Sequence, residues 1–62
     1  MEMYRDCCYQ FVDNGDGKVW LTTRWFHYFP MPKRWAEKII ELLKSGNIKK
    51  ACHYIDMAER RA

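Results

Sequence analysis

The chain has 62 residues, a length that fits one small domain and that buries only about 60% of the surface its unfolded form exposes. Hydrophobic residues make up 48% of the chain and aromatic residues 16%, which excludes a disordered segment. The net charge of +3 is weaker than the concentrated basic excess of most nucleic-acid-binding domains. Because so small a core is often completed by a partner, we expect contact with another protein or with a second copy.

Residues 4–28 are expected to form a β-hairpin. Residues 4–13 and 18–28 are rich in β-branched and aromatic side chains, which suit a pleated sheet. Residues 14–17, Asn-Gly-Asp-Gly, lie between them and are typical of a tight turn. The turn also resembles part of an EF-hand calcium loop, but two essential ligand positions of that loop would lack carboxylates. The hairpin turn is therefore the preferred interpretation.

The register of the hairpin follows from which side chains share a face. If Phe11 pairs with Val19 and Tyr9 pairs with Leu21, these four side chains form one apolar face. The polar side chains on the opposite face are then Gln10, Lys18 and Thr22. This pairing leaves a loop of odd length, which typically needs a glycine in a left-handed conformation, and Gly15 or Gly17 can supply it.

Residues 29–32, Phe-Pro-Met-Pro, are expected to end the hairpin as a connector, because neither proline can donate a hydrogen bond to a sheet. Beyond this connector the apolar period changes from two residues to 3.6, which predicts a helix over residues 33–45. Gly46 ends this helix in a left-handed conformation. Asn47 then begins a second predicted helix, over residues 47–60.

These elements predict an α+β fold within a single domain, in which an N-terminal β-hairpin is followed by a two-helix hairpin (ββαα). We expect both helices to pack on one face of the β-hairpin. The outer face would then have no cover within the chain, and Val12, Trp20 and Trp25 are candidates for that face. An uncovered apolar face is a physical reason to expect a partner.

Residues 42–52 (Leu-Leu-Lys-Ser-Gly-Asn-Ile-Lys-Lys-Ala-Cys) resemble the opening of the Fis-type helix-turn-helix, which is also seen in phage terminase small subunits and transposases. The resemblance implies a DNA-reading helix further along the chain. Asp56 stands where that family has a glycine, and Met57 takes the apolar position that follows it. Residues 58–62 are too few for a recognition helix of normal length. A plain helical hairpin is preferred, and a truncated DNA-binding motif is the alternative.

The three cysteines, Cys7, Cys8 and Cys52, are expected to be free thiols in a reducing, cytoplasmic setting, because an odd number does not suit a disulfide framework. With His27 and His53 they are also potential zinc ligands. Cys7 and Cys8 would point to opposite faces of a strand, however, and Cys52 and His53 diverge on a helix. We therefore expect no metal and no cofactor. No apolar run is long enough to span a membrane, so no membrane partner is expected.

No catalytic motif is found in the sequence. The only glycine-rich segment is the Asn-Gly-Asp-Gly turn, which is acidic and would repel a phosphate. Acid–base chemistry needs a desolvated pocket, and a chain of this size can hardly enclose one. His27 is accordingly interpreted as a packed or interface histidine. We expect that the protein is not an enzyme.

The preferred function is that of a non-catalytic protein-binding module, for example a phage or mobile-element accessory factor or inhibitor that acts by contact or by self-association. Residues 24–35 hold five of the ten aromatic residues, and Trp, Tyr and Arg are frequent interface hot spots. The residues expected to contact the partner are Trp20, Arg24, Trp25, His27, Tyr28, Phe29, Lys33 and Arg34. The alternative is nucleic-acid binding, in which these aromatic side chains stack on bases beside Lys and Arg contacts.

Overall fold

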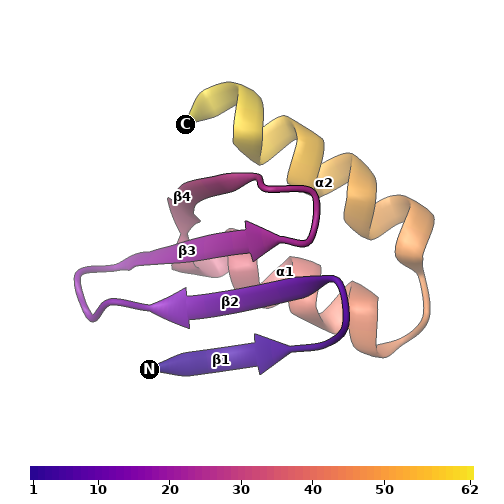
Figure 1. The fold of residues 1–62 in the computed structure, drawn as a ribbon, viewed down its shortest axis with the longest axis horizontal. Helices are drawn as coiled ribbons and strands as arrows, with labels where there is room; N and C mark the ends of the chain where they lie inside the picture. The colour runs from indigo at the N-terminus through magenta and orange to yellow at the C-terminus, as the bar shows by residue number, and fades with distance from the viewer.

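The computed structural model describes residues 1–62 and contains four strands followed by two helices (Figure 1). The elements are β1 (Glu2–Arg5), β2 (Tyr9–Asp13), β3 (Lys18–Thr23), β4 (Tyr28–Pro32), α1 (Lys33–Lys44) and α2 (Ile48–Arg61). The strands form one antiparallel sheet in the order β1-β2-β3-β4. The prediction of an α+β fold is therefore confirmed, whereas the predicted ββαα order is wrong because the sheet has four strands.

Each strand of the predicted hairpin over residues 4–28 is divided in two. The first predicted strand, residues 4–13, is interrupted at Asp6. Its carboxylate accepts hydrogen bonds from the backbone N–H groups of Cys8 and Tyr9, both at 2.8 Å. A side chain that satisfies the backbone in this way favours a turn over a continuous strand. The second predicted strand, residues 18–28, is interrupted at residues 24–27, which form another turn.

The predicted connector over residues 29–32 is wrong, because these residues belong to β4, an edge strand of the sheet. The backbone N–H of Lys33 donates to the carbonyl of Gly17 at 3.1 Å, so this N–H faces β3. Backbone N–H groups alternate in direction along a strand. Pro30 and Pro32 therefore occupy the positions that face away from β3, where a missing donor does not interrupt the ladder.

The predicted hairpin register is displaced by two residues. Phe11 lies opposite Leu21, and Asp13, not Phe11, lies opposite Val19. A displacement of two residues keeps every side chain on its predicted face, so the apolar face itself is correct. Both glycines of the turn are left-handed, with φ of 83° at Gly15 and 86° at Gly17. The Asp13 carboxylate accepts the Gly15 N–H at 2.8 Å within this turn, whose centre lies one residue later than the predicted pairing places it.

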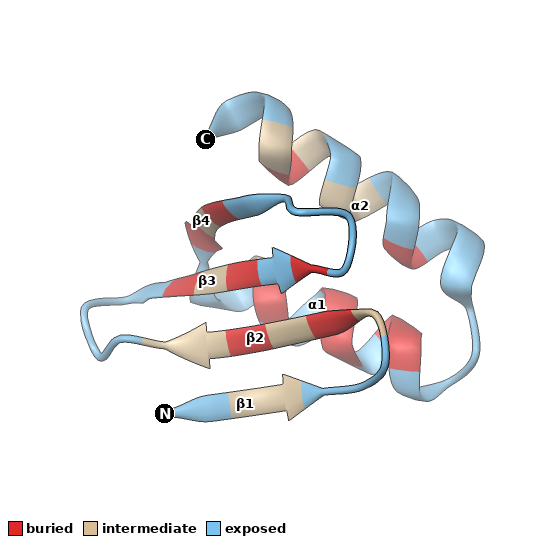
Figure 2. Cartoon of the chain, viewed as in Figure 1, coloured by how far each residue is buried: buried red, intermediate tan, exposed pale blue.

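The two helices match their predicted ranges to within one residue at each end, and Gly46 between them is left-handed with φ of 83°. Both helices contact β4, and α1 also contacts β3 and α2. Figure 2 shows the buried residues alternating along β3 and recurring along α1. The buried hydrophobic cluster comprises Tyr9, Phe11, Val19, Leu21, Phe29, Met31, Ala36, Ile39, Ile40, Leu42, Leu43, Ala51 and Ala58. Neither helix has the length and apolar character that a membrane crossing requires.

The other face of the sheet carries the side chains that alternate with the core positions. We call it the open face, and its residues on β2, β3 and β4 are Gln10, Val12, Lys18, Trp20, Thr22, Tyr28, Pro30 and Pro32. None of them belongs to the core cluster. Trp25, which the sequence placed beside Val12 and Trp20, is not on this face because it lies in the turn after β3.

Candidate functional site

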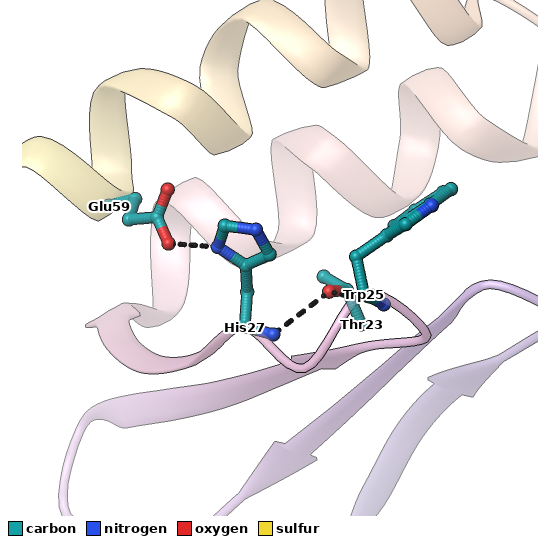
Figure 3. A network of polar contacts seen from close by, with 4 residues as sticks. All are labelled: Thr23, Trp25, His27 and Glu59. Atoms are coloured by element: carbon teal, nitrogen blue, oxygen red, sulfur yellow. Dashed lines mark hydrogen bonds and ion pairs between the residues drawn. The ribbon is translucent and has the colours of Figure 1, made fainter.

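The β3–β4 turn (residues 24–27) is organised by Thr23, the one buried polar residue of the chain. Its Oγ1 accepts hydrogen bonds from the backbone N–H groups of Trp25 at 3.3 Å and His27 at 3.2 Å (Figure 3). Its carbonyl accepts a third bond, from the N–H of Phe26 at 3.1 Å. One threonine thus satisfies three consecutive backbone donors, which fixes the conformation of the turn.

Two side-chain contacts hold the same turn against the body of the domain. Figure 3 shows the ring of His27 pointing toward the carboxylate of Glu59 on α2, and His27 Nδ1 contacts that carboxylate. The indole of Trp25 lies against the ring of Tyr9, with 5.9 Å between the ring centroids. The turn is therefore tethered on its helix side at both of these residues.

Phe26 lies at the tip of the turn in an unusual conformation. Its φ is 69°, and it is the one residue other than glycine with a positive φ. Its exposed fraction is 96%. A left-handed conformation costs a residue with a Cβ atom about 1–2 kcal/mol, and a fully exposed phenyl ring gains nothing by burial. Backbone strain combined with an exposed aromatic ring is characteristic of functional positions.

A groove of about 260 Å³ lies between the β3–β4 turn and α2. Its lining residues are Tyr9, Thr23, Trp25, His27, Cys52, Ile55, Asp56 and Glu59. The Tyr9 hydroxyl and the Cys52 thiol are in contact at 3.5 Å. Burial, and then this hydrogen bond, raise the pKa of Tyr9, so its hydroxyl stays protonated at neutral pH. The groove therefore combines apolar surface with a hydroxyl, a thiol and the carboxylates of Asp56 and Glu59.

The open face carries a pair of stacked aromatic rings. The rings of Trp20 and Tyr28 have centroids 4.7 Å apart and planes inclined by 28°. Val12 and Pro30 lie opposite Trp20 on the two neighbouring strands, which extends the apolar surface across the sheet. Tyr28 follows the β3–β4 turn directly and is 66% exposed. The stacked pair thus lies next to the turn along the chain.

The eight residues predicted to contact a partner separate into several groups. Trp20 and Tyr28 are together on the open face, and Trp25 and His27 are together in the β3–β4 turn. Arg24 is exposed at the start of the turn, and its side chain forms no ion pair.

Three other predicted contact residues lie elsewhere. Phe29 is 6% exposed and belongs to the core, because alternation along β4 turns its side chain inward. It is therefore removed from the candidate surface. Lys33 forms an ion pair with Asp13, and Arg34 lies on α1 in a separate groove.

Sequence reasoning missed Phe26, which it assigned to a continuous strand. A signal was available in the run Trp25-Phe26-His27-Tyr28-Phe29. Five consecutive rings break the alternation of polar and apolar residues that a half-buried strand requires. Thr23, two residues before this run, is of a residue type that stabilises turns through its hydroxyl.

Asp6, Cys7 and Cys8 form the one cluster of potential metal ligands, with all their ligand atoms within 4.8 Å of one another. The expectation that Cys7 and Cys8 diverge is wrong, because they lie in a turn, with their Sγ atoms 3.4 Å apart. The Asp6 carboxylate already accepts hydrogen bonds from Cys8, Tyr9 and the Tyr4 hydroxyl. A tetrahedral zinc ion would need a fourth ligand.

Comparisons with protein-family models, curated proteins and solved structures gave no match.

Proposed function

We propose that this chain is a non-catalytic protein-binding module whose β3–β4 turn inserts Phe26 and Trp25 into an apolar pocket of another protein. The observation that supports the proposal is the state of Phe26, an aromatic side chain that is 96% exposed on a left-handed backbone. Folding alone gives no reason for such a residue at this position, since glycine or asparagine would adopt the conformation at lower cost. A partner that buries the ring supplies a reason.

The anchoring of the turn supports the same function. Thr23 bonds three backbone donors of the turn, and His27 ties it to Glu59. A contact loop that is already ordered loses little conformational entropy on binding, which favours affinity. Trp25 is 56% exposed while its ring rests on Tyr9, so it presents a fixed surface beside Phe26.

Charges around the turn define the chemistry of the partner. The Arg24 guanidinium has no acidic partner within the chain. Asp6 lines a groove with Arg24, but its carboxylate accepts hydrogen bonds from Tyr4, Cys8 and Tyr9. The two acids that line the groove beside α2 are paired as well, Glu59 with His27 and Asp56 with Arg60. The partner expected for this surface is a protein with an apolar pocket whose rim carries Asp or Glu side chains.

The remaining features of the site agree with binding through contact alone. In the groove, His27 Nδ1 bonds to Glu59 and the Cys52 thiol bonds to the Tyr9 hydroxyl, so no hydrogen bond joins the histidine to the thiol as a base would be joined to its nucleophile. The three cysteines are free thiols, which suits a reducing compartment such as the cytoplasm. The stacked Trp20 and Tyr28 would extend the contact onto the open face.

Site-specific photo-crosslinking tests this function. The aromatic crosslinker p-benzoylphenylalanine is placed at position 26 and, as a matched control, at Lys49, which is exposed on the first turn of α2. In extract of the native host cell, a heterologous adduct is expected from position 26 and not from position 49. An excess of wild-type protein without the crosslinker should suppress this adduct by competing for the partner, whereas an excess of Phe26→Ala protein should not.

Three results of this experiment would contradict the proposal. The first is the absence of any adduct from position 26. The second is suppression of the adduct by the Phe26→Ala protein to the same extent as by the wild-type protein. The third is an adduct that contains only a second copy of this chain. That result would mean that the turn binds another copy of the chain and no other protein.

A further inference from the structure

The exposed face of α1 carries basic and acidic residues side by side. Arg34 and Lys38 are one turn apart and line grooves toward α2, whereas Glu37, Glu41 and Lys44 line a different groove. Neither Arg34 nor Lys38 forms an ion pair with an acid. Arg34 and Lys38 repel each other at this spacing, and Glu37 and Glu41, each three residues after one of them, offset that repulsion within the helix.

Arg34 and Lys38 line two neighbouring grooves together with the cationic side chains of Lys18 and Arg61. One, of about 310 Å³, is lined by Lys18, Arg34 and Arg61 together with Trp35. The other, of about 250 Å³, is lined by Arg34, Trp35, Lys38 and Tyr54. Because the grooves share Arg34 and Trp35, they form one continuous surface. We call it the basic track, defined by Lys18, Arg34, Lys38 and Arg61 with the rings of Trp35 and Tyr54.

No acidic side chain lines the basic track. Three acids of neighbouring elements are used in the pairs Asp13–Lys33, Asp56–Arg60 and Glu59–His27, and Asp16 accepts the backbone N–H of Lys18. Glu37 and Glu41 of α1 form no ion pair and line a different groove. The four cations of the track form no ion pair in the chain. The first turn of α1 also has basic residues and no acid, which is the reverse of what the helix dipole favours. A bound polyanion would offset this unbalanced positive charge.

The aromatic rings of the track indicate which polyanion fits. The Arg61 guanidinium lies over the ring of Trp35, 5.3 Å from its centroid, and Trp35 meets the ring of Tyr54 edge to face. Planar guanidinium and aromatic groups beside a row of cations are the elements with which proteins hold single strands, stacking on bases and pairing with phosphates.

We infer that single-stranded nucleic acid binds along the basic track, with its phosphates paired to Lys18, Arg34, Lys38 and Arg61. This site is separate from the β3–β4 turn and does not depend on the proposed protein-binding function. It also differs from the surface that the sequence suggested for nucleic acid, where Trp20, Trp25, Tyr28 and Phe29 were expected to stack on bases. On the basic track, the exposed Arg61 guanidinium that lies over Trp35 is the planar group available to a base.

Fluorescence anisotropy with a labelled thymidine oligonucleotide of about 20 nucleotides tests the inference. Pairing with four phosphates predicts that log K falls with log salt concentration at a slope of roughly −3, since each contact on a single strand contributes about −0.7. The double variant Arg34→Glu/Lys38→Glu should lose at least about tenfold in affinity. The matched control is Lys49→Glu/Lys50→Glu, which changes the net charge equally at two exposed residues that line neither groove.

The control double variant should lose much less affinity than the track variant, and Phe26→Ala should bind the oligonucleotide as the wild type does. Arg34→Gln/Lys38→Gln, which removes both positive charges without introducing acids, should also bind weakly while circular dichroism shows the native fold. Equal losses in the two Glu variants would overturn the site, because they would indicate attraction by net charge alone. Absence of binding at micromolar protein, a slope near zero or a preference for duplex would overturn it as well.

Discussion

The ammonium group of Lys33 lies 3.2 Å from the carboxylate of Asp13, and this ion pair joins the first residue of α1 to the last residue of β2. Asp13 also accepts the backbone N–H of Gly15 in the turn that follows β2. The Gly15 hydrogen bond and then the Lys33 side chain hold the pKa of Asp13 below its ordinary value. One carboxylate thus stabilises a hairpin turn and a helix start together.

The first prediction concerns the dependence of stability on pH. Because the pKa of Asp13 is lower in the folded than in the unfolded chain, its contribution is present above the unfolded pKa and is lost as pH falls through the folded pKa. Asp13→Asn should therefore lower the urea midpoint at pH 7 and lower it less at an acidic pH, because the wild-type carboxyl becomes protonated as pH falls through its folded pKa. Tryptophan fluorescence measures both midpoints. An equal difference at the two pH values would contradict the assignment.

The second prediction concerns the strain at Phe26. Phe26→Gly should stabilise the fold by roughly 0.5–1 kcal/mol, because glycine adopts a positive φ without the Cβ penalty but loses more chain entropy on folding. Phe26→Ala removes the same phenyl ring and keeps the penalty, so its free energy of unfolding should stay near that of the wild type. Urea denaturation distinguishes the two variants. If both change stability by the same amount, the backbone of Phe26 is not strained.

The third prediction concerns Thr23. Thr23→Val keeps the shape of the side chain but removes the oxygen that accepts the N–H groups of Trp25 and His27. The loss should cost about 1–3 kcal/mol, because two donors lose their acceptor in a part-buried site. Amide hydrogen exchange should become faster at Trp25 and His27 in particular. Thr23→Ser retains the hydroxyl and should leave both exchange rates close to the wild-type values, or the proposed role of Oγ1 is wrong.

The fourth prediction concerns the stacked pair on the open face. A double-mutant cycle of Trp20→Ala and Tyr28→Ala should give a coupling energy of about 0.5–1.5 kcal/mol, as expected for rings in contact. The control cycle combines Trp20→Ala with Trp25→Ala, since Trp25 stacks on Tyr9 instead. This control should give a coupling near zero. Additive effects in the first cycle would show that the stack does not persist in solution.

The helices and the core face of the sheet could be read from the sequence, because each depends on a local pattern. The apolar positions of α1 recur with a helical period, and Gly46 supplies the left-handed residue that ends the helix. Phe11 and Leu21 follow the period of two that places side chains on one face of a strand. Such periodicities remain visible even when the register is off by two residues.

The breaks between strands could not be read in the same way, since side chains rather than Gly or Pro cause them. Asp6 and Thr23 each end a strand by accepting backbone hydrogen bonds, and both residue types also occur within strands. The left-handed state of Phe26 follows from the turn that Thr23 organises, so no propensity of phenylalanine indicates it. The basic track joins residues from β3, α1 and α2, which only the tertiary structure brings together.

The two prolines of β4 have a consequence for how the sheet ends. Their positions face outward, so two of the backbone donors that another strand would need are missing from this edge. The other edge belongs to β1, which has only four residues and an irregular register between Glu2 and Tyr4. Neither edge is a regular template for a further strand, so at high concentration the protein should resist edge-to-edge stacking into fibrils.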